Sequence, residues 1–185
     1  QSGATLQPQY LVVNGKPMLK FPAANDDTGA EMYLGDLSAQ FPSEASLFAA
    51  ATIGVGATPD GRYNLFGNRD NDDRWVANSW TESQPGSFRG GRTAMPYASW
   101  PQTGTHAFSL ESSSTSYRVV VDGTQIGTAA GDYNSGSGQI FTIGDRPGNG
   151  QQLNGAIPEL LLYNRVLSAV EADQVGVYLA AKYGL

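Results

Sequence analysis

The sequence predicts an all-β protein, built as two stacked antiparallel sheets with one short helix at the C-terminal end. Three observations predict this class. Short apolar runs of strand length recur along the chain, separated by clusters of Gly, Asn, Asp and Ser. Two pairs of runs are joined by dipeptides that tolerate positive φ and favour hairpin turns, Asn14-Gly15 and Asp122-Gly123. Helical spacing of apolar residues occurs only after Ser168.

The first half of the chain contains a hairpin, a long apolar strand and a loop-rich region. Its apolar runs predict strands at residues 10–13, 18–21, 31–34, 46–55, 62–66 and 73–77. The run at 46–55 is continuously apolar and carries no charge, so we expect a buried central strand there. Residues 81–101 are rich in Gly, Ser, Pro and Arg, and we expect long loops with little regular structure.

The second half predicts its strands and the helix more clearly. Strands are expected at residues 105–112, 117–121, 124–128, 139–143 and 155–163. Because Pro158 cannot donate to a strand ladder, the last of these strands lies at a sheet edge or carries a bulge. Ser168 and Glu171 form a capping box for a helix that Gly184 can close. The helical spacing continues through Ala172, Val175, Leu179 and Lys182.

Composition and charge narrow the class of partner. The 185 residues suit one domain, and we expect a single domain over residues 1–185. The formal net charge of -6 makes nucleic acid and anionic membranes poor partners. No stretch approaches the roughly 18 apolar residues of a membrane helix, so we expect no membrane insertion. With 23 Gly and only 15% charged residues, the chain is typical of a secreted or cell-surface module.

Six segments, in a consistent order along the chain, resemble one known family. They are residues 14–21 (NGKPMLKF), 25–27 (NDD), 117–123 (YRVVVDG), 143–146 (IGDR), 153–168 and 178–185. Through them the chain is similar to the concanavalin A-like lectin/glucanase superfamily, and within it to laminin G-like (LamG) domains of secreted bacterial proteins. The resemblance implies a two-sheet jelly-roll sandwich. Pro158 departs from the small or acidic residue that members often carry.

Members of this family include glycan-binding modules, adhesion domains, structural appendages and enzymes. The jelly-roll glucanases carry a Glu-x-Asp-x-x-Glu strand that places three carboxyls in one cleft, and this chain lacks that motif; Glu111 and Glu159 are isolated in their strands. His106 is the only candidate base for a Ser-His-Asp triad, but no Gly-x-Ser-x-Gly motif marks a nucleophile. His106 shares a strand face with Phe108 and Leu110, which favours a half-buried, hydrogen-bonded histidine. We expect no enzymatic activity.

The loop-rich middle of the chain combines aromatic and arginine side chains, as sugar-binding sites do. An aromatic ring packs against the C–H face of a pyranose, and Arg, Asn and Asp hydrogen-bond its hydroxyls. Arg also binds uronate or sulfate oxygens in bidentate fashion. The predicted ligand-binding residues are Trp80, Trp100, Tyr97, Arg69, Arg74, Arg89 and Arg92. In the alternative, the tryptophans fill the core, Trp75 above all, and the arginines form surface ion pairs.

Two acidic segments offer the hard oxygen ligands that calcium prefers. The candidate ligands are Asp26 and Asp27 in the first segment, and Asp70 and Asp72 in the second. Neither segment matches an EF-hand loop, and Asn and Asp favour turns on their own, so turn formation is the alternative. The chain has no Cys and a single His, which excludes a thiolate or multi-histidine metal centre.

These observations predict a carbohydrate-binding or adhesion module of a larger secreted or surface protein. The expected partner is a glycan or cell-surface polysaccharide, with other domains of the parent protein as further partners. The chain opens at Gln1 rather than Met, and we expect a piece of a longer protein. Two alternatives stay open. One is a protein-interaction or spacer domain of an adhesin or phage-like fibre, and the other is a polysaccharide hydrolase or lyase with an unfamiliar site.

Overall fold

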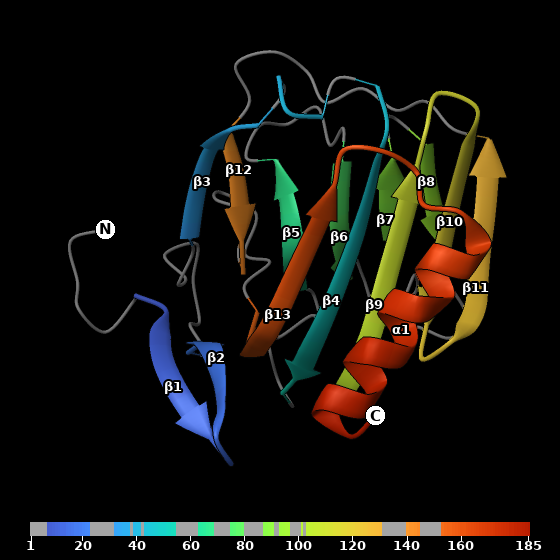
Figure 1. The fold of residues 1–185 in the computed structure, drawn as a ribbon. Helices are drawn as coiled ribbons and strands as arrows, with labels where there is room; N and C mark the ends of the chain where they lie inside the picture. The colour runs from blue at the N-terminus through green and yellow to red at the C-terminus, as the bar shows by residue number, and fades with distance from the viewer. Residues whose placement is uncertain are drawn as a thin grey trace.

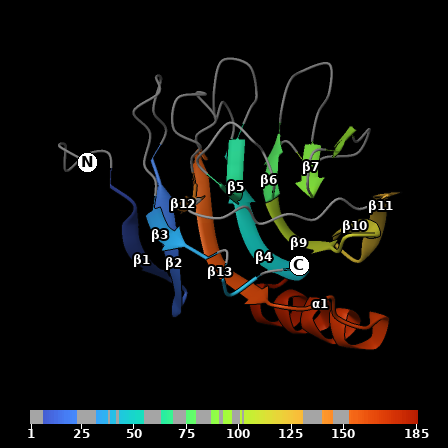
Figure 2. The same cartoon turned by 90° about the horizontal axis from the view of Figure 1, so that it is seen from above.

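The computed structural model is a two-sheet sandwich with a helix on one side (Figure 1). The structure describes residues 7–22, 32–37, 39–41, 43–54, 63–68, 75–79, 87–90, 93–96, 101, 103–130, 140–144 and 153–185. Seen from above, the two sheets face each other, and α1 (Ala169–Tyr183) lies on the outer side of the larger sheet (Figure 2). The predicted sandwich and its C-terminal helix are confirmed.

Within the described residues, the larger sheet has seven strands and the smaller sheet has six, all paired antiparallel. The larger sheet consists, in spatial order, of β1 (Gln9–Val13), β2 (Lys16–Phe21), β13 (Gly155–Tyr163), β4 (Ala45–Ile53), β9 (Gly104–Ser112), β10 (Ser116–Val121) and β11 (Thr124–Ala130). The smaller sheet consists of β3 (Met32–Asp36), β12 (Ile140–Ile143), β5 (Tyr63–Asn68), β6 (Trp75–Ser79), β7 (Ser87–Gly90) and β8 (Thr93–Pro96).

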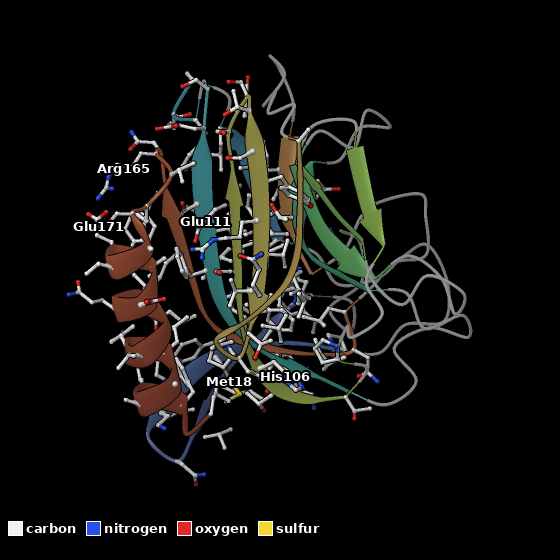
Figure 3. The ribbon with its side chains drawn as sticks, turned by 90° about the vertical axis from the view of Figure 1, so that its right-hand side faces the viewer. Met18, His106, Glu111, Arg165 and Glu171 are labelled. Atoms are coloured by element: carbon white, nitrogen blue, oxygen red, sulfur yellow. The ribbon has the colours of Figure 1, made fainter. Side chains whose placement is uncertain are left out.

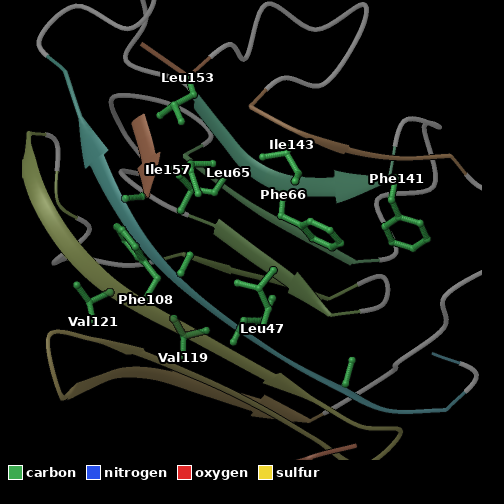
Figure 4. Close-up of a cluster of buried hydrophobic side chains, with 14 of the residues drawn as sticks. Leu47, Leu65, Phe66, Phe108, Val119, Val121, Phe141, Ile143, Leu153 and Ile157 are labelled. Atoms are coloured by element: carbon green, nitrogen blue, oxygen red, sulfur yellow. The ribbon is translucent and has the colours of Figure 1, made fainter. Parts of the chain in front are cut away.

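The main core lies between the two sheets because successive residues of a strand point to opposite faces. Leu47 of β4 points inward, as do Phe108 of the neighbouring β9 and Val119 of β10 beyond it (Figure 4). Phe66 and Phe141 join them from the smaller sheet, and their rings stack with centroids 5.5 Å apart. Burying each such side chain stabilises the fold by about 1.5–3 kcal/mol.

The outer face of β4 is buried as well, which confirms the prediction of a buried central strand. Phe48 points towards the helix and packs with Leu179. Ser46, on the same face, donates its hydroxyl hydrogen to the Arg165 carbonyl at 3.0 Å and accepts the Leu167 N–H at 3.1 Å. These contacts attach the segment before α1 to the middle of the larger sheet.

Both predicted hairpin turns form. The φ angles are 53° and 74° at Asn14 and Gly15, and 48° and 75° at Asp122 and Gly123. Positive φ at both central residues is the type I′ geometry, whose twist matches that of the flanking strands. The turn residues therefore set the register of the β1–β2 and β10–β11 pairs.

Pro158 lies at a bulge of β13. The pairing of β13 with β4 shifts between Ala156 and Glu159, so that Pro158 does not need to donate a ladder hydrogen bond. β13 lies between β2 and β4, and the bulge, not a position at the sheet edge, accommodates the proline.

The prediction of loops with little regular structure over residues 81–101 is wrong for residues 87–90 and 93–96, and most of its other residues lie outside the described part of the chain. β7 and β8 form a hairpin at the edge of the smaller sheet, with Ser87 opposite Pro96 and Gly90 opposite Thr93. Each strand has only four residues, too few for an alternating apolar pattern to appear in the sequence. Backbone pairing defines these strands instead, because β7 pairs with β6 and β8 pairs with β7.

The helix α1 is capped as the sequence predicts. The Ser168 hydroxyl accepts the Glu171 N–H at 3.4 Å, and the Glu171 carboxylate accepts the Ser168 N–H at 2.9 Å. Gly184 ends the helix with a φ of 74° and donates its N–H to the Ala180 carbonyl at 2.8 Å. In the described part of the chain, no helix has the length and apolar character needed to span a bilayer.

Gly144 is expected to be intolerant of any side chain. It has a φ of 85°, and a Cβ at this position would overlap the buried ring of Phe21. We expect Gly144→Ala to destabilise the fold by about 3 kcal/mol, because a left-handed backbone costs about 1–2 kcal/mol and overpacking about 1–3 kcal/mol. Urea unfolding measures the loss.

Gly123→Ala is the matched control for this substitution. Gly123 has a φ of 75°, but nothing lies within 4 Å of a Cβ built there. Only the backbone cost of about 1–2 kcal/mol then applies. Equal losses of stability in the two variants would show that close packing against Phe21 does not constrain Gly144.

Candidate functional site

The predicted ligand-binding residues fall mostly outside the part of the chain that the structure describes. Those outside are Trp80, Trp100, Tyr97, Arg69, Arg74 and Arg92. Arg89 lies in β7, where its backbone pairs with Val76 of β6 and Ala94 of β8. The structure therefore describes the strands to which these segments connect, and not the segments themselves.

The strands from which these segments leave end at two opposite ends of the smaller sheet. The register pairs Trp75 with Gly90 at one end of β6, and Asn78 with Ser87 near the other. Because neighbouring strands are antiparallel, the connections after β5 and β7 leave from the first end, and those after β6 and β8 leave from the second. Arg69, Arg74 and Arg92 belong to the first set of connections, and Trp80, Tyr97 and Trp100 to the second. Variants of these arginines and variants of these aromatic residues can therefore be tested as two separate sets.

The predicted calcium ligands Asp26, Asp27, Asp70 and Asp72 also lie outside the described residues. Among the residues that are described, no three His, Asp or Glu side chains gather in the way that a metal site requires. The described elements thus offer no metal centre of their own, and the calcium hypothesis stays a prediction.

His106 occupies a half-buried position on β9, as predicted, near the lower end of the molecule in Figure 3. Its Nδ1 lies 2.7 Å from Asp122 Oδ2, and its Nε2 lies 2.9 Å from the Thr103 carbonyl oxygen. The ring also meets Phe108 edge-on, with centroids 6.1 Å apart. Both ring nitrogens thus face acceptors within the protein. Through these contacts the imidazole connects the β10–β11 turn to β9.

Glu111 is a buried carboxylate on the outer face of β9 that is held by one arginine. Arg118, directly opposite on β10, donates from Nη2 to Oε1 at 2.6 Å and from Nε to Oε2 at 3.1 Å. The hydrogen bonds to Glu111 raise the pKa of Arg118, burial opposes that effect, and the negative charge of Asp173 adds to the rise. The bidentate pair occupies both carboxylate oxygens of Glu111.

Glu159 on β13 receives several donors from the last turns of α1. Lys182 Nζ lies 2.9 Å from its carboxylate, and the hydroxyls of Tyr178 and Tyr183 donate to it at 2.9 and 3.0 Å. Burial alone would raise the pKa of Glu159, but these hydrogen bonds outweigh it and leave the pKa lowered. The pKa of Lys182 is raised by its contacts with Tyr178 and Glu159. These hydrogen bonds hold the last turns of α1 against β13.

Glu171 forms a third ion pair at the start of α1, where Figure 3 shows it next to Arg165. Arg165 donates from Nη2 to Oε1 at 2.6 Å and from Nη1 to Oε2 at 2.9 Å. The hydrogen bonds from Arg165 and then from Ser168 lower the pKa of Glu171 to about 2. A carboxyl with so low a pKa holds no proton at neutral pH, so it cannot act as a general acid.

The sequence could have indicated one of these three pairs. Glu111 and Arg118 flank a short turn between two predicted strands, and an antiparallel register places them opposite each other. The contacts of Glu159 depend on where the helix crosses the sheet, and no local pattern indicates that position.

A family model described as the concanavalin A-like lectin/glucanases superfamily matches residues 38–172. This match covers most of the strands that build the sandwich, from β4 to β13. Among curated proteins, no sequence matches the chain.

Solved structures with the same fold include carbohydrate-related proteins. A Trypanosoma rangeli sialidase in complex with the inhibitor DANA gives a TM-score of 0.65 at 21% identity, covering 90% of this chain and 28% of the sialidase. The same sialidase in complex with sialic acid gives 0.66 at 17% identity, covering 95% and 29%. A SAP-like pentraxin from Limulus polyphemus gives 0.56 at 12% identity, covering 72% and 70%. The chain spans less than a third of the sialidases, and the likeness to all three shows the fold alone.

The ion pair of Glu171 predicts a dependence of stability on pH. Its pKa is about 2 in the folded protein, against an ordinary value of 4.5. The pair therefore stabilises the fold fully above about pH 4.5, and this contribution is lost as the pH falls towards 2. Gln can keep the capping hydrogen bond, so Glu171→Gln is expected to remove the charge and reduce the slope of unfolding free energy against pH in this range.

Urea unfolding at a series of pH values measures that slope. Arg165→Gln should reduce it as well, because it removes the principal cause of the lowered pKa. A slope unchanged in both variants would show that the ion pair does not form in solution.

Proposed function

The chain belongs to the concanavalin A-like lectin/glucanases superfamily, and we propose that it is a non-catalytic carbohydrate-binding or adhesion module of a larger secreted or surface protein. The proposal rests on one observation, which is how three glutamate side chains of the described residues are hydrogen-bonded. Glu111, Glu159 and Glu171 are each hydrogen-bonded to a basic side chain. Glycoside hydrolysis by paired carboxyls requires one of them to hold a proton as the general acid. The pKa values of Glu159 and Glu171 are lowered by their hydrogen-bond donors, and both carboxylate oxygens of Glu111 accept hydrogen bonds from Arg118.

Binding in this proposal takes place at the segments between the strands of the smaller sheet. Trp80, Trp100 and Tyr97 supply faces for pyranose rings, and arginines such as Arg89 and Arg92 hydrogen-bond hydroxyl or acidic groups. No bond is made or broken. The expected affinity is modest, because desolvation offsets much of the hydrogen bonding in a wet site.

The similar structures support a carbohydrate context and not a particular reaction. The match covers only 28% of the sialidase chain, so it gives no reason to assign sialidase activity here. Site chemistry, and not fold, decides the activity.

A second candidate function is a protein-interaction or spacer domain. The observation that favours it is an exposed apolar surface on β1, the end strand of the larger sheet. Tyr10 and Val12 of this strand are 69% and 59% exposed. Unpaired edge strands with apolar side chains are typical positions for contact with another chain.

A glycan array separates these two functions. We expect the chain to bind specific glycans, and Trp80→Ala or Trp100→Ala to weaken binding at least about tenfold, as expected when an aromatic anchor is lost. The variants Arg69→Ala and Arg92→Ala test the other end of the sheet separately. Tyr10→Ala removes an exposed aromatic ring from β1 and is the matched control, with binding unchanged.

Three results would contradict the proposal. The absence of binding to neutral and acidic glycans, with and without calcium, would favour the spacer domain. Equal losses in Tyr10→Ala and the tryptophan variants would show that binding is not localised to the predicted residues. Cleavage of a polysaccharide, abolished by one carboxylate change or by His106→Ala, would make the chain an enzyme.

A further inference from the structure

A groove runs between α1 and the outer face of the larger sheet, the face turned away from the smaller sheet. Its volume is about 440 Å³, within the roughly 300–1,000 Å³ of small-molecule sites. Ala107, Ser109 and Val120 of β9 and β10 form its floor. Gly176 and Val177 of the helix form its wall. Figure 3 shows Glu111 and His106 at opposite ends of β9, the strand along the floor.

The groove exists because the helix covers only part of the sheet. The buried side chains of α1, Ala172 and Leu179, pack on Phe48 of β4 and leave the outer face of β10 beside them uncovered. Gly176 lies between them in sequence and faces the groove without a side chain, and a Cβ built on it meets nothing within 4 Å. The space is open, and it is apolar along its middle.

Charged side chains lie at the two ends of the groove floor. At one end Arg118 uses Nε and Nη2 to hold Glu111, while its Nη1 has no acceptor among the described residues. Asp173 of the helix lines the same end, and no described residue hydrogen-bonds its carboxylate. Asp122 lines the other end. The groove thus offers a donor and an acceptor at the Arg118 end, whereas the Asp122 carboxylate at the other end contributes its charge and already contacts His106 and the Ala107 N–H.

The charged side chains that line the groove disfavour the binding of anionic ligands. The charge of Arg118 is balanced by Glu111, so the charges of Asp173 and Asp122 make the groove negative. His106, beside Asp122, carries a positive charge only when protonated. Uronates, sulfates and sialates are therefore unfavourable occupants, whereas neutral or amino-bearing molecules are favourable.

We propose that this helix-side groove is a second ligand site, which binds a short neutral or amino-bearing saccharide. Val120 and Val177 contact C–H groups of the sugar, Asp173 accepts hydrogen bonds from hydroxyl or ammonium groups, and Arg118 donates from Nη1. The choice of a saccharide rests on the proposed function, while the groove and its charge do not.

Gly176→Leu gives a direct test, because its side chain fills the groove. A Cβ at Gly176 meets nothing within 4 Å, and Leu favours a helix interior more than Gly does, so we expect the variant to fold, which its amide spectrum checks. Val170→Leu is the matched control, because Val170 is 67% exposed on the same helix and does not line the groove. Asp173→Asn is a second variant that keeps the shape and removes the charge.

The probes are trisaccharides of glucose, glucosamine and galacturonic acid, with trilysine as a peptide. Titrations followed by amide NMR should shift Ala107, Ser109 and Gly176 with the glucose or glucosamine probe, and not with galacturonic acid. Gly176→Leu should weaken that binding at least about tenfold, and Val170→Leu should not. Asp173→Asn should weaken binding of glucosamine more than binding of glucose.

Three outcomes would overturn the proposal, and each leaves a distinct conclusion. Saccharide binding that shifts none of the groove amides and is lost in Trp80→Ala would reject the groove site and keep the proposed function. Binding of trilysine at the groove in place of the saccharides would make the groove a peptide site. If no saccharide binds anywhere on the protein, the proposed function fails together with the choice of ligand.

Discussion

The fold depends on the burial of β4 on both of its faces. Leu47 and its inward neighbours join the core between the sheets, while Phe48 packs under the helix. A shift of one residue in the pairing of β4 with β9 or β13 would exchange these two faces. It would also move Ser46 away from Arg165 and Leu167, which it connects to the sheet. The position of α1, and with it the groove beside the helix, therefore depends on the register of this one strand.

The strong electrostatic contacts of the described elements hold the helix and the strands in place. Glu171 with Arg165 lies at the start of α1, Glu159 with Lys182 lies at its end, and Glu111 with Arg118 joins two strands. Exposed pairs of this kind contribute little stability, but a buried carboxylate such as Glu111 is costly without its partner. The two binding surfaces that we propose do not use these pairs. One is the set of segments between the strands of the smaller sheet, and the other is the groove, where no described residue hydrogen-bonds the Asp173 carboxylate.

The sequence predicted the parts of the fold that local patterns specify. The apolar run at 46–55, the turns at Asn14-Gly15 and Asp122-Gly123, and the capping box at Ser168 all appear as expected. The alternating apolar pattern of the sequence could not predict β7 and β8, because each has only four residues and is defined by its backbone pairing. The groove is a product of tertiary packing, because its floor and wall come from segments far apart in the chain. The half-buried state of His106 was predictable from its strand face, but its partner Asp122 required the hairpin geometry.

The spatial order of the larger sheet has a consequence for how the protein is made. β2 and β4 are produced early, yet the strand that lies between them is β13, which comes shortly before the helix. Until β13 leaves the ribosome, the N-terminal hairpin has no neighbouring strand to join, and the outer face of β4 has no helix to cover it. Pairing segments so distant in sequence carries a large loop-closure cost and makes folding slow. While the residues between β4 and β13 are synthesised, the nascent domain therefore carries β4 without the strand and the helix that later cover it, and in that interval β4 is open to association with other chains.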